Sequence, residues 1–160
     1  MLIPIKVKQI VLDQNLSPVV ILSNKEGDQV LPIWVGTYEA QAIALAIQGI
    51  LTPRPLTHDL IINLCEKLGA EIKKVLVQDV REGTYYAELY LHQGDKEYVI
   101  DARPSDAITI ALRTNAPLYI TEKVAAYTVN VDELVSEDQV EELEELLKDI
   151  KPEEDKKHLH

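Results

Sequence analysis

Cysteine, tryptophan and phenylalanine are rare or missing in this sequence. Its 160 residues include one cysteine, one tryptophan and no phenylalanine. The single cysteine, Cys65, excludes an intramolecular disulfide framework, and on that ground we expect a cytoplasmic location. Cys65 follows apolar residues and is interpreted as buried core rather than as a nucleophile. Trp34 lies between Ile33 and Val35 and is interpreted as core or interface, with a platform for stacking a nucleobase as the alternative.

Long apolar runs and familiar cofactor signatures are also missing. No apolar stretch approaches the roughly 20 residues that cross a bilayer, so we expect no membrane partner. The first residues show no charged leader before an apolar segment, so we expect no signal peptide. The sequence has no Gly-rich phosphate loop before a helix, no paired cysteines and no His-Glu-x-x-His pattern. No familiar cofactor is therefore predicted from a motif.

Positive charge is scarce, and the deficit is concentrated at one end. The formal net charge is −11. Residues 1–131 carry 12 Lys and Arg against 15 Asp and Glu, whereas residues 132–160 carry 4 against 12. Phosphate binding favours a basic surface, so the total charge argues against nucleic acid as a partner. Residues 1–131 are close to neutral, however, and their charge neither favours nor excludes a nucleic acid. We divide the chain into one domain over residues 1–131 and an acidic tail over residues 132–160.

Hydrophobic periodicity predicts an α+β fold with mainly antiparallel strands. The expected strands cover residues 2–13, 18–23, 30–35, 71–80, 84–92, 96–101 and 117–121. The expected helices cover residues 37–50, 57–68, 104–114 and 135–150. Thr37 is the expected N-cap of the first helix. The last helix is amphipathic and acidic; it is expected to dock on the body or on a second subunit, with a frayed tail after it.

The sequence resembles itself at a spacing of 67 residues. Eight of the 29 positions in 18–46 are identical in 85–113, where composition alone would give roughly two or three. The identical pairs are Leu22/Leu89, Gly27/Gly94, Asp28/Asp95, Ile33/Ile100, Ala40/Ala107, Ile43/Ile110, Ala44/Ala111 and Leu45/Leu112. One interpretation is a duplicated strand-strand-strand-helix unit, which would place Glu39 and Asp106 at equivalent helix starts. The other is that two similar hairpin-plus-helix units converged.

Polar side chains gather near three of the predicted helix starts, in segments 36–39, 54–59 and 101–106. Each segment has an acid in or near the first helical turn, where the helix dipole would stabilise it without any further function. Histidine gains or loses a proton near neutral pH, and the dipole disfavours the cation, so His58 is a candidate for proton transfer. The alternative is a loop histidine that is hydrogen-bonded to backbone.

Arginines and carboxylates near these helix starts suggest phosphate or metal binding. Arg54 and Arg103 suit bidentate phosphate recognition, although Arg103 could instead pair internally with Asp101, Asp106 or Glu39. The spacing of Asp101 and Asp106 permits them to share a hard cation.

These segments carry a family resemblance. Ile33-Trp-Val-Gly-Thr-Tyr-Glu-Ala40, Arg54-Pro-Leu-Thr-His-Asp-Leu60 and Asp101-Ala-Arg-Pro-Ser-Asp-Ala-Ile108 resemble motifs of the bifunctional nuclease family, formerly a domain of unknown function, over roughly residues 1–131. The resemblance implies a nuclease that acts on DNA and RNA, as reported for some plant members. Some relatives carry a C-terminal motif like that of excision-repair proteins. The acidic tail here shows no such motif, so no repair partnership is expected.

We therefore expect a phosphodiester hydrolase. The candidate catalytic residues are Glu39, His58, Asp59, Asp101 and Asp106, with His58 in proton transfer and Asp59 positioning it. The candidate substrate-binding residues are Arg54, Arg103 and Ser105. Glu39, Asp101 and Asp106 would orient water or hold a divalent cation such as Mg²⁺ or Mn²⁺. The alternative function is a non-catalytic anion-binding or oligomeric module, and in either case we expect a homo-oligomer.

Overall fold

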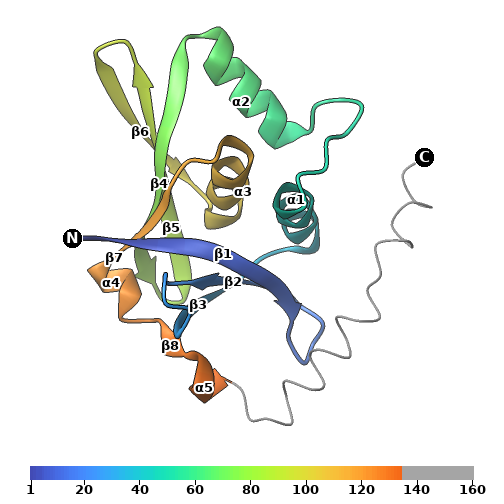
Figure 1. Cartoon of the computed structure of the whole chain (residues 1–160), viewed down its shortest axis with the longest axis vertical. Helices are drawn as coiled ribbons and strands as arrows, with labels where there is room; N and C mark the ends of the chain where they lie inside the picture. Colours follow the sequence, from blue (N-terminus) through green and yellow to red (C-terminus); the bar gives the residue numbers. More distant parts are fainter. Residues whose placement is uncertain (135–160) are drawn as a thin grey trace.

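The computed structural model describes residues 1–134 and shows a mixed α/β protein built on one eight-stranded sheet (Figure 1). The strands are β1 (Leu2–Leu12), β2 (Pro18–Ser23), β3 (Gln29–Trp34), β4 (Ala70–Arg81), β5 (Thr84–Gln93), β6 (Lys96–Ala102), β7 (Leu118–Thr121) and β8 (Val129–Asn130). The helices are α1 (Thr37–Ile47), α2 (Thr57–Lys67), α3 (Pro104–Thr114), α4 (Glu122–Ala125) and α5 (Val131–Leu134).

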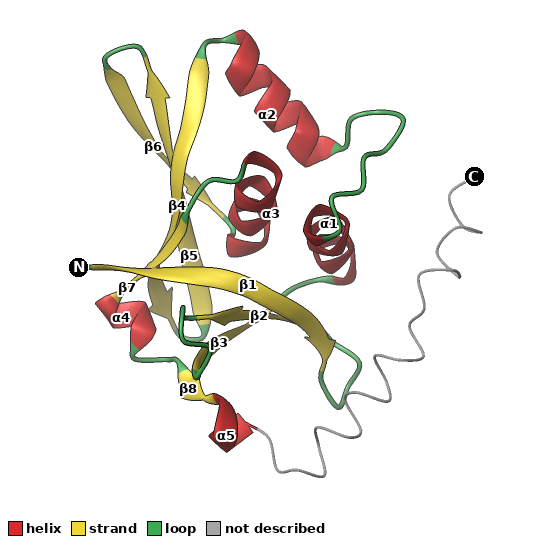
Figure 2. Ribbon diagram, in the orientation of Figure 1, coloured by secondary structure: helices red, strands yellow, loops and turns green. Residues whose placement is uncertain are grey.

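The sheet is mostly antiparallel, as expected. Its strand order is β6-β5-β4-β7-β1-β2-β3-β8, and the β4–β7 pair is parallel whereas the other neighbours are antiparallel. Strand β7 therefore joins the meander β4-β5-β6 to the meander β1-β2-β3. Figure 2 shows these two meanders running crosswise, with α1 and α3 in the angle between them.

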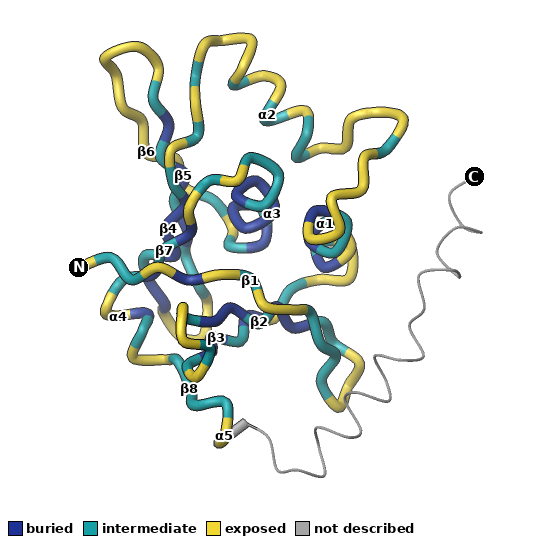
Figure 3. The backbone as a smooth tube through the Cα atoms, viewed as in Figure 1, coloured by how far each residue is buried: buried dark blue, intermediate teal, exposed yellow. Residues whose placement is uncertain are grey.

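Helix α3 lies at the centre of the molecule. It buries six of its residues, among them Ile108, Thr109 and Ile110, and it contacts α1, α2, β4 and β5. Pro104 occupies the first helical turn, where its missing N–H is harmless, and Asn115 ends the helix in the left-handed conformation. Figure 3 shows α3 as one of the most buried segments. Because its start is anchored by this packing, α3 can hold polar side chains in fixed positions.

Helix α2 is peripheral by comparison and buries none of its residues. Leu60, Leu64 and Leu68 all remain exposed. Cys65, expected to be buried, is half-buried. The edge strand β6 is exposed from Lys96 to Asp101. The apolar core lies instead under α1 and α3, where their buried aliphatic side chains meet those of β2, β4, β5 and β7.

The order strand-strand-strand-helix occurs on both sides of α2. Gly27 and Gly94 both adopt positive φ in the hairpin turns of the two halves, where glycine avoids the strain of a Cβ. That the two halves arose by duplication stays a prediction from the sequence repeat.

Local details of the prediction need correction. Gly36, not Thr37, is the N-cap of α1, and no side chain caps that helix. Helix α1 ends at Ile47, three residues before the predicted end. The short elements α4, β8 and α5 were not predicted.

Some predictions fall on residues that the structure does not describe. The predicted helix at 135–150 and the tail after it lie outside the described residues, so the division at residue 131 stays a prediction. Within residues 1–134, every helix is too short or too polar to span a bilayer.

Candidate functional site

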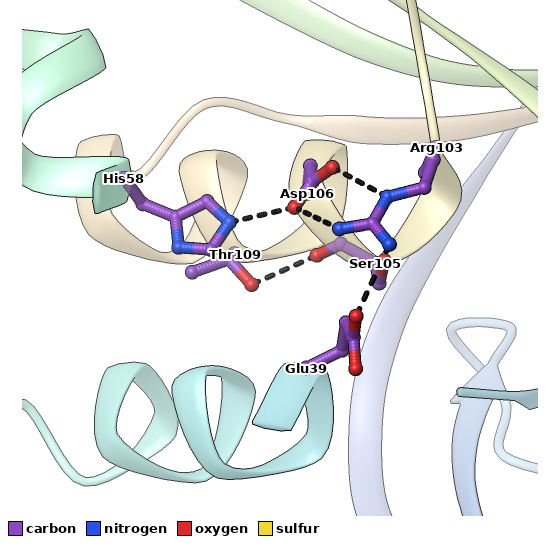
Figure 4. Close-up of polar contacts among 6 residues, drawn as sticks. All are labelled: Glu39, His58, Arg103, Ser105, Asp106 and Thr109. Carbon is purple, nitrogen blue, oxygen red and sulfur yellow. Dashed lines mark hydrogen bonds and ion pairs between the residues drawn. The ribbon is translucent and has the colours of Figure 1, made fainter. Parts of the chain in front are cut away.

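Arg103 lies at the junction of β6 and α3 and joins the starts of two helices. It is the N-cap residue of α3 and has an extended backbone conformation. Its Nε donates to Oδ2 of Asp106 at 2.8 Å, and its Nη2 donates to Oδ1 of the same carboxylate at 3.2 Å. Its Nη1 donates to Oε1 of Glu39 in α1 at 3.1 Å (Figure 4). These contacts raise the pKa of Arg103, with Asp106 as the largest cause, so the guanidinium is a permanent cation.

Asp106 also holds His58, which comes from a third helix. Nε2 of His58, in the first turn of α2, lies 2.9 Å from Oδ1 of Asp106. Burial on its own would raise the pKa of Asp106, but hydrogen bonds from Arg103 and His58 outweigh it and lower the pKa. Asp106 is therefore an ionised carboxylate that fixes two side chains at once (Figure 4).

The contact with Asp106 also selects a tautomer of His58. A carboxylate can only accept hydrogen bonds, so Nε2 of the imidazole must carry the hydrogen. In the neutral ring the other nitrogen, Nδ1, is then the one able to accept a proton. The His58 side chain is 14% exposed, so the ring is held by its surroundings but reaches solvent. A histidine oriented by a carboxylate in this way is suited to general acid-base chemistry.

Glu39 is positioned by a glycine as well as by Arg103. A Cβ on Gly36 would overlap the Glu39 carboxylate. Glycine at the α1 N-cap therefore lets this carboxylate fold back over the helix start and still reach Arg103. The glycine matters here for the close approach of the Glu39 carboxylate and not for its backbone conformation, because its φ of −72° is accessible to any residue.

Asp59 has different partners from those predicted. Its Oδ2 accepts the backbone N–H of Leu56 at 2.9 Å, which caps α2, and its Oδ1 lies 3.8 Å from Nε of Arg113. Among the described contacts none joins Asp59 to His58. Asp59 therefore anchors the start of α2 to α3, whereas Asp106 orients His58.

Three other predicted residues have no described contact with His58. Arg54 and Asp101 are exposed, and no side-chain contact in the described part of the chain joins either of them to the cluster of Glu39, Arg103 and Asp106. Ser105 is buried in the first turn of α3, and its carbonyl accepts the Thr109 hydroxyl at 2.8 Å.

The predicted cation site is not assembled. Residues 1–134 contain no group of three or more His, Cys, Asp or Glu side chains arranged to hold a metal ion. Glu39 and Asp106 both face the Arg103 cation, and Asp101 is not joined to them. The residues present therefore do not fit a metal held by Glu39, Asp101 and Asp106, and no step below depends on one.

A hollow of about 350 Å³ opens beside Arg103 on the side of Glu39. Its walls come from three places: β3 and the segment after it, the β4–β5 turn, and the start of α3. They include Ile33, Trp34, Val35, Thr84, Tyr85 and Arg103. The β4–β5 turn was missing from the predicted site because it joins two strands, whereas the predicted site residues were taken from helix starts. The pairing of β5 with β6, in which Ala87 lies opposite Ala102, brings this turn next to the start of α3.

Comparisons with known proteins agree with the motifs. The family model described as bifunctional nuclease domain matches residues 20–132. The chain is 44% identical to an uncharacterized protein of Mycobacterium tuberculosis, over 84% of this chain and 86% of that protein. It is 31% identical to bifunctional nuclease 1 of rice (Oryza sativa subsp. indica) and 32% identical to bifunctional nuclease 2 of Arabidopsis thaliana. These two matches cover 66% of this chain but 33% of each plant protein.

Proposed function

This chain belongs to the bifunctional nuclease domain family, and from that membership we propose that it hydrolyses phosphodiester bonds in DNA, RNA or both. The observation that carries the proposal is the 2.9 Å contact between Nε2 of His58 and Asp106, beside the exposed guanidinium of Arg103. The names of the plant relatives, bifunctional nuclease, support the same reaction class. The substrate is a nucleic acid in this proposal.

His58 performs the proton transfer in the proposed reaction. With its Nε2 hydrogen directed at Asp106, Nδ1 takes a proton from water as the water oxygen bonds to phosphorus. The P–O bond to the leaving oxygen breaks, and the leaving oxygen takes a proton from solvent. The resulting imidazolium is stabilised by the Asp106 carboxylate, which stays ionised because its pKa is lowered. Asp106 is thus a positioning residue for His58. A positioned base of this kind contributes typically about 100-fold to 10,000-fold to a rate.

Arg103 binds the phosphate. Its side chain is 64% exposed, and Nη1 and Nη2 each make only one described contact. Each of these terminal nitrogens carries two hydrogens, so donors remain for a phosphate oxygen. Arg54, exposed in the loop before α2, supplies a second cation, and Ser105 a nearby polar group. Glu39 and Asp101 orient water in this proposal.

Removal of the His58 imidazole tests the proposal. The His58→Ala variant should hydrolyse labelled single-stranded DNA and RNA at least about 100-fold more slowly than the wild type. His92→Ala is the matched control, because His92 is also paired with a carboxylate, Glu97 at 3.6 Å, but lies on β5. Activity equal in both variants at unchanged melting temperature would indicate a contaminating nuclease and refute the proposal.

A non-catalytic role is the alternative, and the internal pairing of Asp106 favours it. Arg103 and His58 already neutralise this carboxylate, so the cluster could simply tie α1, α2 and α3 together or bind an anion. The two functions differ in His58→Ala: a structural role predicts a lower melting temperature, whereas catalysis predicts lost turnover at an unchanged one.

A homo-oligomer is also part of the proposal. The exposed leucines Leu60 and Leu64 of α2 and Leu68 at its C-cap recur every four residues and so share one face. The exposed edge of β6 offers unpaired backbone groups to another strand. A second copy related by two-fold symmetry would cover both. Light scattering should give at least twice the mass of one chain for the wild type, and a lower mass for the Leu60→Asp, Leu64→Asp double variant.

A cytoplasmic location stays a prediction from the cysteine content. It is checked by following the full-length protein through cell fractionation, and recovery outside the cytoplasmic fraction would contradict it.

A further inference from the structure

The hollow beside Arg103 contains an exposed indole that is held in place. Trp34 is 59% exposed although it ends a strand whose preceding residue, Ile33, is 3% exposed. Its Nε1 donates to Oδ2 of Asp13 at 2.9 Å. The other Asp13 oxygen accepts the backbone N–H groups of Asn15 and Ser17, at 2.8 and 2.9 Å. The ring is therefore fixed at its edge while one side of it remains available.

Asp13 is suited to this role because it stays ionised. The hydrogen bond from Trp34 is the largest cause that lowers the pKa of Asp13, followed by the bond from Ser17. A ring that is already immobilised loses little conformational freedom when a planar ligand stacks on it. Tyr85, which is half-buried, also lines the hollow and adds a second aromatic ring to it.

The charges around the hollow indicate what it can hold. Glu39 lines it and Asp13 borders it through Trp34, so a phosphate placed among these carboxylates would be repelled. The Arg103 guanidinium also lines the hollow. It is paired with Glu39, but its side chain is 64% exposed, and its terminal nitrogens keep N–H donors for a phosphate. A ligand with a neutral planar group on Trp34 and a phosphate at Arg103 would avoid the repulsion and use the attraction. A nucleotide unit has these two parts. The volume of about 350 Å³ falls in the range of roughly 300–1,000 Å³ typical of small-molecule pockets.

From this juxtaposition we propose that the hollow is a nucleobase subsite in which an unpaired base stacks on Trp34 while its phosphate contacts Arg103. A base inside a duplex is covered on both faces and paired at its edge. The subsite therefore selects single-stranded DNA or RNA, or a frayed end, over an intact duplex. The inference rests on the proposed function, since it names the class of nucleic acid that the same site accepts.

The sole tryptophan makes the subsite directly observable. Stacking of a base on Trp34 should quench the intrinsic tryptophan fluorescence. The titration uses the full-length His58→Ala variant, which should bind without cleaving. Its probes are a single-stranded oligothymidylate, a duplex oligonucleotide of equal length, and a sugar-phosphate oligomer that lacks bases. We expect quenching by the single strand, binding at least about tenfold weaker for the duplex, and no quenching by the abasic oligomer.

Variants separate stacking from general affinity. Trp34→Ala should weaken binding of a labelled single strand by about 5-fold to 150-fold, which corresponds to the roughly 1–3 kcal/mol of one stacked base. Trp34→Phe retains a smaller ring and should lose much less. Tyr38→Ala is the control, because Tyr38 is an exposed aromatic that does not line the hollow, and it should bind like the wild type.

The outcomes distinguish the subsite from the proposed reaction. Quenching by the single strand with no hydrolysis in the wild type would leave the subsite standing and refute the nuclease. Hydrolysis that is unchanged in Trp34→Ala, or a bound strand that leaves the fluorescence unaltered, would overturn the subsite and spare the nuclease. Equal affinity for the abasic oligomer would also overturn it, because the binding would then depend on phosphates alone.

Discussion

The first turns of α3 and α1 meet at Arg103 but are held differently. Asp106 in α3 makes three side-chain hydrogen bonds, two with Arg103 and one with His58. Glu39 in α1 makes one within the described residues, with Arg103. Helix α3 buries six of its residues, whereas α1 buries three. The start of α3 is therefore the fixed half of the site, and the start of α1 is the half that can adjust around a ligand.

The largest loss of hydrolysis should come from a substitution at the start of α3, the fixed half of the site. Asp106→Asn preserves size but removes the charge that orients His58 and Arg103. We expect hydrolysis of a single-stranded oligonucleotide to fall by about 100-fold or more, with a small change in melting temperature because Asp106 lies outside the core. If Asp106→Asn hydrolysed the oligonucleotide as fast as Glu39→Gln does, the starts of α3 and α1 would contribute equally to activity, which would contradict this prediction.

A change of intermediate size should come from Gly36→Ala in the adjustable half. The new Cβ would displace the flexible Glu39 carboxylate from Arg103. The lost charged contact should reduce hydrolysis by about tenfold. In a Glu39→Ala background the same glycine change should have no further effect, because its target is gone. Additive losses in the double variant would show that Gly36 acts through something other than Glu39.

Glu39→Gln should have a smaller effect. The amide oxygen can still accept from Arg103, and only the charge is lost from an ion pair whose arginine is mostly exposed. A loss of up to about fivefold in kcat/KM corresponds to the 0.2–1 kcal/mol of such pairs. Steady-state kinetics at two salt concentrations would check it, since a larger loss at low salt is expected for a charge effect.

The smallest effect on hydrolysis should come from a change at Asp79, a buried carboxylate outside both helix starts, which should instead control stability in acid. Hydrogen bonds from Lys123, first, and from Arg81 lower the pKa of Asp79 from 3.8 to about 2. The folded pKa lies below the unfolded one, so the stabilisation is fully present above about pH 4 and is lost as the pH falls toward 2. In urea unfolding, Asp79→Asn should lose less stability than the wild type between pH 4 and pH 2. Parallel losses would contradict this assignment.

Local signals predicted the larger elements well. The bounds of α3 agree with the sequence because Pro104 marks its first turn, and the apolar spacing marks its buried face. Residues 122–134 form elements of two to four residues, too short for a hydrophobic period to be recognised. The exposure of Trp34 was not predictable either, since alternation with Ile33 says which sides the two residues face but not what covers them.

The site shows the same division between local and distant information. Asp59, next to His58 in sequence, was the expected partner, but adjacent residues of a helix do not face each other. The actual partner, Asp106, lies 48 residues away and reaches His58 only because α2 packs on α3. The attraction of Arg103 for acids was predictable, whereas its joint contact with Glu39 and Asp106 depends on the packing of α1 against α3.

The parallel pairing of β7 with β4 has a consequence for synthesis of the protein. Strand β7 lies between β4 and β1 in the sheet. Along the chain, however, it comes after every element that contributes a residue to the site. Until Leu118–Thr121 leaves the ribosome, the two meanders lack the strand that holds them together. The central strand of the sheet is therefore added late in synthesis, after the residues that face the hollow have already been made.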